Sequence, residues 1–169
     1  MKLVEPCEKY LKSYIAAREE YVVKGIERYP FVDTGKCDIF QKFDDYRHER
    51  NLKPGYVGAD YYWLVDEENN FFIGEICIRH RLTVALLQYG GHIGYGIRYS
   101  EWNKGYGTLM LRLGLEKAKD RGMVEEVIIT NYKNNVGCII FMVIVYPENM
   151  MVSCLSYEKI MNEYQKIYE

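Results

Sequence analysis

A strand, a tight turn and the start of a helix follow one another in the stretch Gly90–Thr108, which reads GGHIGYGIRYSEWNKGYGT. Gly105 and Gly107 stand where the helix begins, and a glycine lets backbone N–H groups approach a ligand closely because no Cβ intervenes. The first N–H groups of a helix have no partner within it, and the helix dipole adds partial positive charge there. With the charge of Lys104 added, the stretch predicts a site for a phosphate or pyrophosphate. The alternative interpretation is an ordinary glycine turn with a solvated lysine.

The composition is that of one ordinary globular domain. A chain of 169 residues is long enough for a core, and its net charge of −2 gives no general attraction to nucleic acid or to an anionic membrane. The longest apolar run, Cys138–Tyr146, is far shorter than the roughly 18 residues of a membrane span, and the first residues lack a signal-peptide core. Five scattered cysteines without metal-ligand spacing indicate reduced thiols and no metal. We therefore expect one cytoplasmic domain over residues 1–169, with neither nucleic acid nor membrane as a partner.

Hydrophobic spacing and chain breakers predict a mixed α/β fold. Apolar residues recur at helical spacing in three segments, 8–29 (ended by Pro30), 38–51 and 107–121 (ended by Gly122). Strands are expected at 3–5, 61–66, 71–80, 91–98 and 126–131, with a hairpin turn at 67–70 and a loop or short helix at 81–89. Because strand, helix and strand succeed one another over 91–131, a right-handed crossover should join two parallel strands.

These segments resemble the GNAT superfamily, whose members transfer acyl groups from acyl-coenzyme A. The resemblance rests on Ile93–Arg98 (IGYGIR), on Asn103–Gly107 (NKGYG), on the helix after them and on Val127–Thr130 (VIIT), and it extends over about residues 1–137. Further upstream, YWLVD at 62–66 and GEICIRH at 74–80 look like a bacterial group of predicted N-acetyltransferases. The family loop reads (Gln/Arg)-x-x-Gly-x-(Gly/Ala), and here Trp102 replaces its first residue, which normally lies over the pyrophosphate.

The resemblance implies a central, mostly antiparallel sheet with one splayed parallel strand pair, flanked by helices. It also implies transfer of an acetyl group from acetyl-CoA to a primary amine of a small molecule or peptide, and coenzyme-binding residues at Tyr95, Gly96, Ile97, Arg98, Asn103, Lys104, Gly105, Tyr106, Gly107 and Thr108. The strand residues would pair with the pantetheine arm, and the amides of Lys104–Thr108 would bind the pyrophosphate. A backbone N–H near Ile97 would stabilise the developing oxyanion.

The chain departs from the family after about residue 137. On the family spacing from Asn135, the tyrosine that protonates the leaving sulfur falls on Met142. The apolar run 138–146 fits a buried strand at least as well as a helix, and 157–168 has the spacing of an amphipathic helix. Real divergence and an altered reading frame both explain this atypical segment 138–169. A long apolar edge would also permit a homodimer.

The catalytic candidates are Glu75, His92 and Tyr132. Glu75 lies on a strand where related enzymes sometimes carry the general base, although an alternating strand would also place it in solvent. His92 and His80 lie at strand ends, where a structural histidine is the alternative to a base. Tyr132 follows the strand 126–131 and would reach the cleft as an acid, as would Tyr146, unless both are surface or core aromatics.

Three arginines near strand ends, Arg79, Arg81 and Arg98, fit either an acidic substrate, the coenzyme 3′-phosphate or plain solvation. For the whole chain, the alternative to an N-acetyltransferase is a coenzyme-A-binding module that lost catalysis with its altered tail. A nucleotide-binding protein is disfavoured because the chain lacks Gly-x-x-x-x-Gly-Lys-(Ser/Thr).

Overall fold

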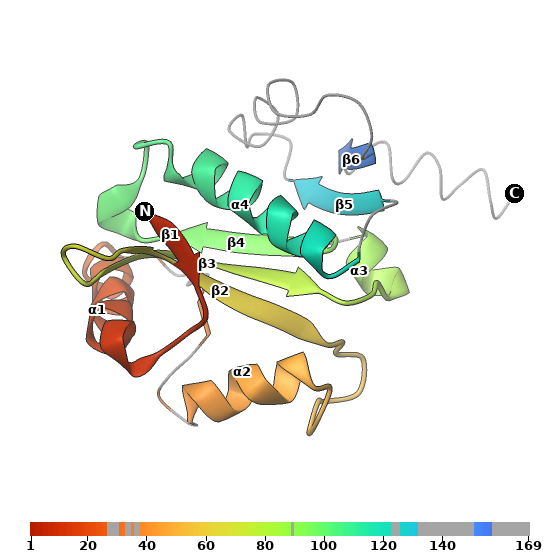
Figure 1. The fold of residues 1–169 in the computed structure, drawn as a ribbon, viewed down its shortest axis with the longest axis horizontal. Helices are drawn as coiled ribbons and strands as arrows, with labels where there is room; N and C mark the ends of the chain where they lie inside the picture. Colours follow the sequence, from red (N-terminus) through yellow and green to blue (C-terminus); the bar gives the residue numbers. More distant parts are fainter. Residues whose placement is uncertain are drawn as a thin grey trace, which may run out of the picture.

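A computed structural model of the chain describes residues 1–26, 31–32, 35, 38–88, 90–122, 126–131 and 151–156. Figure 1 shows the helices and strands along it. The helices are α1 (Glu8–Val23), α2 (Ile39–Arg47), α3 (Val84–Gln88) and α4 (Tyr106–Asp120), with a 3₁₀ turn η1 (Tyr99–Glu101) before α4. The strands are β1 (Lys2–Val4), β2 (Ala59–Asp66), β3 (Phe71–Arg79), β4 (Ile93–Ile97), β5 (Glu126–Asn131) and β6 (Met151–Ser156).

Four strands form an antiparallel sheet in the order β1-β2-β3-β4. The β2–β3 hairpin turns where the sequence predicted it, because the Asp66 carboxylate accepts hydrogen bonds from the backbone N–H groups of Glu68 and Asn69 at 3.0 and 3.4 Å. Asn70 closes the turn with φ = 51°, a left-handed conformation that asparagine tolerates. The antiparallel part of the predicted fold is therefore confirmed.

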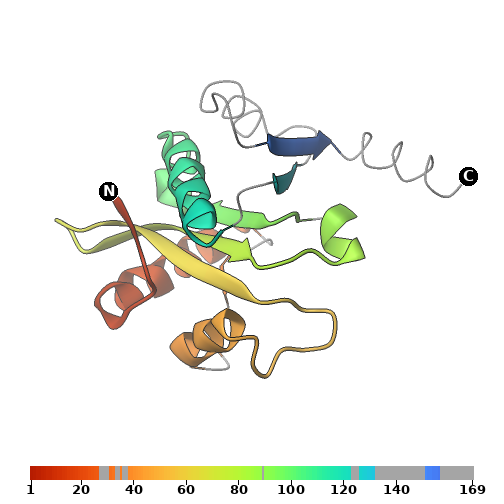
Figure 2. The ribbon, with the colours of Figure 1, turned by 45° about the vertical axis from the view of Figure 1, so that its right-hand side comes forward.

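Helices cover both faces of this sheet. Helix α4 packs on one face, and α1 and α2 pack on the other (Figures 1 and 2). The α4 face buries aliphatic side chains such as Ile76, Met110 and Leu111, whereas the other face is aromatic and centres on Tyr14, Trp63 and Phe72. Alternation along β3 therefore decides which side chains meet α4 and which meet α1 and α2.

Two helices end earlier than predicted. Helix α1 stops at Val23 rather than extending to residue 29, because Gly25 adopts φ = 64° and its N–H bonds to the Val22 carbonyl. The N–H of Ile26 bonds to the Tyr21 carbonyl, which completes a Schellman motif, so this glycine and not Pro30 ends the helix. Helix α2, predicted over 38–51, begins at Ile39 with Asp38 as its N-cap and ends at Arg47, and Glu49 and Asn51 then take positive φ.

The predicted pairing of 91–98 with 126–131 is not among the strand ladders of the described residues. The structure instead pairs β5 in parallel with β6, a strand that the sequence analysis did not predict, in a separate two-stranded sheet. The parallel splayed pair of β4 and β5 thus stays a prediction. The apolar run 138–146 and the predicted helix 157–168 lie outside the described residues.

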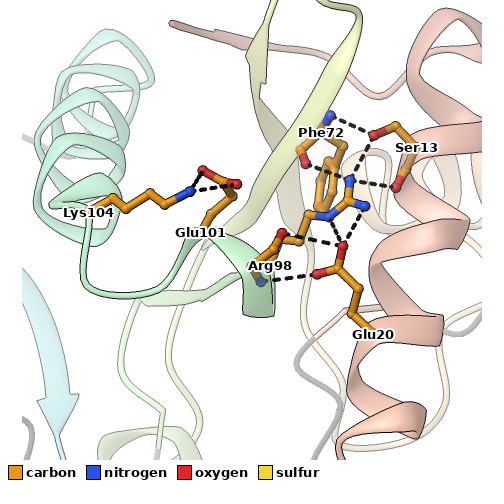
Figure 3. Close-up of polar contacts among 7 residues, drawn as sticks. Ser13, Glu20, Phe72, Arg98, Glu101 and Lys104 are labelled. Carbon is orange, nitrogen blue, oxygen red and sulfur yellow. Dashed lines mark hydrogen bonds and ion pairs between the residues drawn. The ribbon is translucent and has the colours of Figure 1, made fainter.

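Helix α1 is tied to the end of β4 by Arg98, which is only 7% exposed. Its Nε donates to Glu20 Oε1 at 2.6 Å, and its Nη1 donates to Ser13 Oγ at 3.0 Å (Figure 3). Its guanidinium carbon lies 4.1 Å from the centre of the Phe71 ring. Glu20 also accepts a hydrogen bond from the Ser100 backbone N–H at 3.0 Å. The ion pair therefore fixes the chain at the point where β4 leads into η1.

The substitution Glu20→Ala should lower the free energy of unfolding by about 3 kcal/mol, because it leaves the buried Arg98 guanidinium without its counterion. Urea denaturation at neutral pH measures the loss. Glu19→Ala is the matched control, since Glu19 is the exposed neighbour on the same helix, and it should change stability by less than about 0.5 kcal/mol. Equal stability of the two variants would contradict the anchoring role of the pair.

Candidate active site

The backbone of β4 presents alternate residues to the outer edge of the sheet. The N–H of Arg98 bonds to the Ile73 carbonyl at 2.7 Å, and the N–H of Arg79 bonds to the His92 carbonyl at 2.8 Å. In an antiparallel ladder with this register, Gly94 and Gly96 also bond to β3, so the N–H and C=O groups of Tyr95 and Ile97 point away from it. Of the strand residues that the family resemblance singled out, Tyr95 and Ile97 thus have the geometry to pair with an extended ligand, and Gly96 does not.

Two aromatic side chains already bind the carbonyl oxygen of Ile97. Trp102 Nε1 donates to it at 2.8 Å and the Tyr21 hydroxyl donates to it at 2.6 Å. The Trp102 indole is 42% exposed and packs against the rings of Tyr21 and Tyr99. The residue that replaces the usual Gln or Arg therefore supports the end of β4. Sequence reasoning missed this contact, which joins α1, β4 and the loop before α4.

The N-terminus of α4 has the features of an anion site. Gly105 caps the helix with φ = 79° and without a side-chain hydrogen bond, so the first N–H groups of α4 face outward from an exposed loop. A Cβ on Gly107 would lie 3.6 Å from Tyr95 Cε2 and 4.0 Å from Ile97 Cγ1, so the first turn of α4 lies against β4. Asn103, with φ = 61°, turns the chain into this loop. The predicted strand, turn and helix start are thus confirmed as local structure.

Lys104 is paired across the same loop. Its ammonium group lies 3.1 Å from both carboxylate oxygens of Glu101, three residues earlier (Figure 3). The lysine stays half-exposed, whereas Glu101 is mostly covered. A ligand phosphate would therefore compete with Glu101 for this ammonium group.

A pocket of about 350 Å³ lies against β3 and β4 on the face of the sheet that is turned away from α4, the face that α1 and α2 cover. Phe31, Val32, Tyr61, Glu75, Cys77, Arg79, Gly94 and Tyr95 line it. Glu75, Cys77 and Arg79 alternate along β3 and so share this face, and the cross-strand partners of the first two are Gly96 and Gly94. Because these glycines carry no side chains, they do not cover the backbone of β4 on the side that faces the pocket.

Glu75 is the buried acid of this pocket, with 4% of its surface exposed. Trp63 Nε1 donates to its Oε2 at 2.9 Å, and the Val32 backbone N–H donates to its Oε1 at 3.3 Å. Burial raises the pKa of Glu75 to about 7, although hydrogen bonds from Trp63, Tyr14 and Val32 oppose the shift. The solvent-facing alternative for Glu75 is therefore wrong, because the aromatic layer under α1 covers this face of β3.

The other acid–base candidates lie elsewhere. His92 precedes β4, half-buried, and is not among the residues that line the pocket. The Nε2 of His80 lies 3.5 Å from the buried Asp60, and its Nδ1 lies 3.4 Å from Glu49. Burial lowers the pKa of His80, which is part of an ion cluster at the far end of β3. Tyr132 and Tyr146 lie outside the described residues.

The three strand-end arginines have three different environments. Arg98 is buried on Glu20, Arg81 is exposed on Glu49, and Arg79 lines the pocket. Sequence reasoning did not single out Tyr61 or Cys77, which the pocket also contains. The signal was present, since every second residue from 75 to 79 is polar or reactive while the residues between them are isoleucines.

A family model described as the acetyltransferase (GNAT) domain matches residues 5–142. Since this match covers most of the chain, the protein belongs to the GNAT acetyltransferase family. No curated protein and no solved structure matches the chain significantly. In the part of the chain that the structure describes, no helix is both long and apolar enough to span a membrane, and no cluster of His, Cys, Asp and Glu is suited to hold a metal.

Proposed function

We propose that the chain is an acetyl-CoA-dependent N-acetyltransferase that acts on a primary amine of a small molecule or peptide. The observation that carries this proposal is Glu75, a buried carboxyl with a pKa near neutrality in a pocket against β4. A general base works best when its pKa lies near the operating pH. We further propose that residues 1–169 form one cytoplasmic domain in which β4 and β5 splay around the coenzyme.

The residues at the outer edge of β4 and at the start of α4 suit acetyl-CoA. The outward N–H and C=O groups of Tyr95 and the outward N–H of Ile97 would pair with the amides of the pantetheine arm. The N–H groups of Tyr106, Gly107 and Thr108 would bind the pyrophosphate. Asn103, Lys104 and Gly105 complete the loop. The side chain of Arg98 is committed to Glu20 and Ser13, and its backbone N–H and C=O bond to Ile73 and Glu101. Arg98 would therefore contribute by fixing the end of β4. When bound, acetyl-CoA supplies an activated acetyl thioester.

Glu75 would accept the proton that the amine loses when it is acetylated. Trp63 and the Val32 N–H fix the orientation of the carboxylate, and the aromatic side chains around it keep it largely out of water. A carboxylate that is removed from solvent accepts a proton more readily, and the raised pKa of Glu75 shows that burial outweighs its few hydrogen bonds. Tyr132 remains the proposed acid for the second proton transfer, to the departing thiolate, and His92 remains a proposed alternative base.

Calorimetric titration of the purified chain with acetyl-CoA tests this proposal, with ADP and ATP as controls. We expect micromolar affinity for acetyl-CoA and much weaker binding of ATP, because the pantetheine arm would add hydrogen bonds along β4. Release of free thiol in the presence of a panel of primary amines then measures turnover. Absence of acetyl-CoA binding would overturn the proposal.

A further inference from the structure

Arg79 is the arginine that the fold places beside the proposed general base. It alternates with Cys77 and Glu75 on one face of β3, and all three line the same pocket. Burial raises the pKa of the Cys77 thiol and that of the Tyr61 hydroxyl, so both of these groups stay neutral near pH 7. Among the described residues that line the pocket, Glu75 and Arg79 are therefore the ones that can carry a charge near pH 7.

The guanidinium of Arg79 is held in a defined position. Its Nη1 donates to the carbonyl oxygens of Gly90 and Gly91, at 2.8 and 2.9 Å. Its Nη2 lies over Gly94, where a Cβ would come within 3.1 Å of it and within 3.2 Å of Cys77 Sγ. Both hydrogen bonds to the loop thus use one nitrogen, and the other lies on the pocket side, over a residue without a side chain.

The guanidinium of Arg79 extends along β3 in the direction of Glu75. Gly94 is the cross-strand partner of Cys77, and Cys77 lies two residues from Glu75. At about 3.3 Å per residue, the two charged groups are separated by roughly 7 Å along the strand. A small molecule that carries an amine and an anionic group a few bonds apart fits this separation.

We propose that the acceptor is a small amino acid or a close analogue, whose carboxylate binds Arg79 while its amine faces Glu75. This inference rests on the proposed N-acetyltransferase function and names the acceptor class of that same site. A guanidinium forms short, charge-assisted hydrogen bonds with carboxylates, and a preset guanidinium loses little side-chain freedom on binding. An acceptor without the carboxylate would leave the Arg79 charge facing the pocket without a counterion.

Steady-state acetylation of matched acceptors tests the inference on the unmodified protein. The acceptors are α-amino acids and ω-amino acids such as 4-aminobutyrate, and each acid is compared with its carboxamide or with its decarboxylated amine. The rate of thiol release gives kcat/KM for each acceptor. We expect at least one acid to exceed its uncharged counterpart by about tenfold or more, the size of effect that a hydrogen-bonded charge pair produces. Uncharged amines equal to or better than every acid would overturn the inference.

Arg79→Met should then raise KM for the preferred acid about tenfold or more, and the ratio of kcat/KM for the acid to kcat/KM for the uncharged amine should fall by about the same factor. Arg81→Met is the matched control, because Arg81 is exposed on Glu49, and both acceptors should behave as with the unmodified protein. If Arg79→Met does not fold because the contacts to Gly90 and Gly91 are lost, Arg79→Lys is the second variant. It keeps a positive charge at this position and should still prefer the acid. An unchanged acid preference in a folded Arg79→Met variant would also overturn the inference.

Failure of this inference can be distinguished from failure of the proposed function. If acetyl-CoA does not bind the unmodified protein, the proposed function fails. If acetyl-CoA binds and uncharged amines are acetylated without preference for acids, only the acceptor class is wrong. If acetyl-CoA binds and no amino acid is acetylated, the proposed acceptor class is likewise wrong.

Discussion

Glu75→Gln is expected to lower kcat/KM for amine acetylation by roughly 10²- to 10⁴-fold, the range that a positioned general base contributes. Glutamine keeps the size of the side chain and an oxygen that accepts from Trp63, but it cannot take a proton from the amine. Because Glu75 lies on the pocket side of the sheet, away from the start of α4, acetyl-CoA affinity should stay within about twofold. Steady-state kinetics and calorimetry measure the two effects separately.

The pH dependence of the reaction distinguishes a base from a structural carboxyl. A base must be deprotonated to act, and the pKa of Glu75 is raised to about 7. In the unmodified protein, kcat/KM should therefore rise with pH through about 7, and this step should be missing from the Glu75→Gln profile. The control is Glu68→Gln, because Glu68 is exposed in the hairpin turn and its removal should leave the whole profile unchanged. A step near pH 7 that survives in Glu75→Gln would assign the titration to another group.

The stability of Glu75→Gln gives a second readout with a defined sign. The pKa of Glu75 is raised above its usual value of 4.5, so between those two pH values the folded protein holds a proton that the unfolded chain has released. This carboxyl therefore contributes stability at acidic pH that is lost as pH rises toward 7. Denaturant melts of the unmodified protein should show this loss, and those of Glu75→Gln should lack it.

Features determined by neighbouring residues were predictable from the sequence. The helix after Gly105, its end at Gly122 and the hairpin at 67–70 depend on left-handed residues and short-range hydrogen bonds, and the structure confirms each of them. The one helix end that was predicted at a proline, Pro30, is wrong because a nearer local signal precedes it. Gly25 ends α1 five residues before that proline.

Features that depend on long-range packing could not be predicted from the sequence. Whether Glu75 faces water or an aromatic layer depends on the packing of α1 against β3, and Tyr14 is 61 residues away in the sequence from Glu75. The separate environments of Arg79, Arg81 and Arg98 likewise follow from tertiary partners that alternation alone does not supply. The contact between Trp102 and the Ile97 carbonyl reinterprets a departure from the family loop as a supporting interaction.

Gly107→Leu should weaken acetyl-CoA binding at least a hundredfold, equivalent to about 2.7 kcal/mol, while the fold is kept. A Cβ at this position makes only ordinary contacts, at 3.6 Å from Tyr95 and 4.0 Å from Ile97, and leucine favours a helix more than glycine does. The longer side chain would, however, extend from the first turn of α4 past Tyr95 and Ile97, next to the backbone groups that are proposed to bind the coenzyme. Calorimetric titration measures the loss.

Glu116→Leu is the matched control, because Glu116 is an exposed residue further along α4 and gains the same apolar side chain. It should bind acetyl-CoA as the unmodified protein does, and thermal unfolding should show that both variants are folded. A folded Gly107→Leu variant with unchanged affinity would mean that the coenzyme does not lie along the start of α4 and the edge of β4. The N–H groups at the start of α4 would then serve another anion, and the edge of β4 would lose its role in coenzyme binding while the pocket at Glu75 kept its own chemistry.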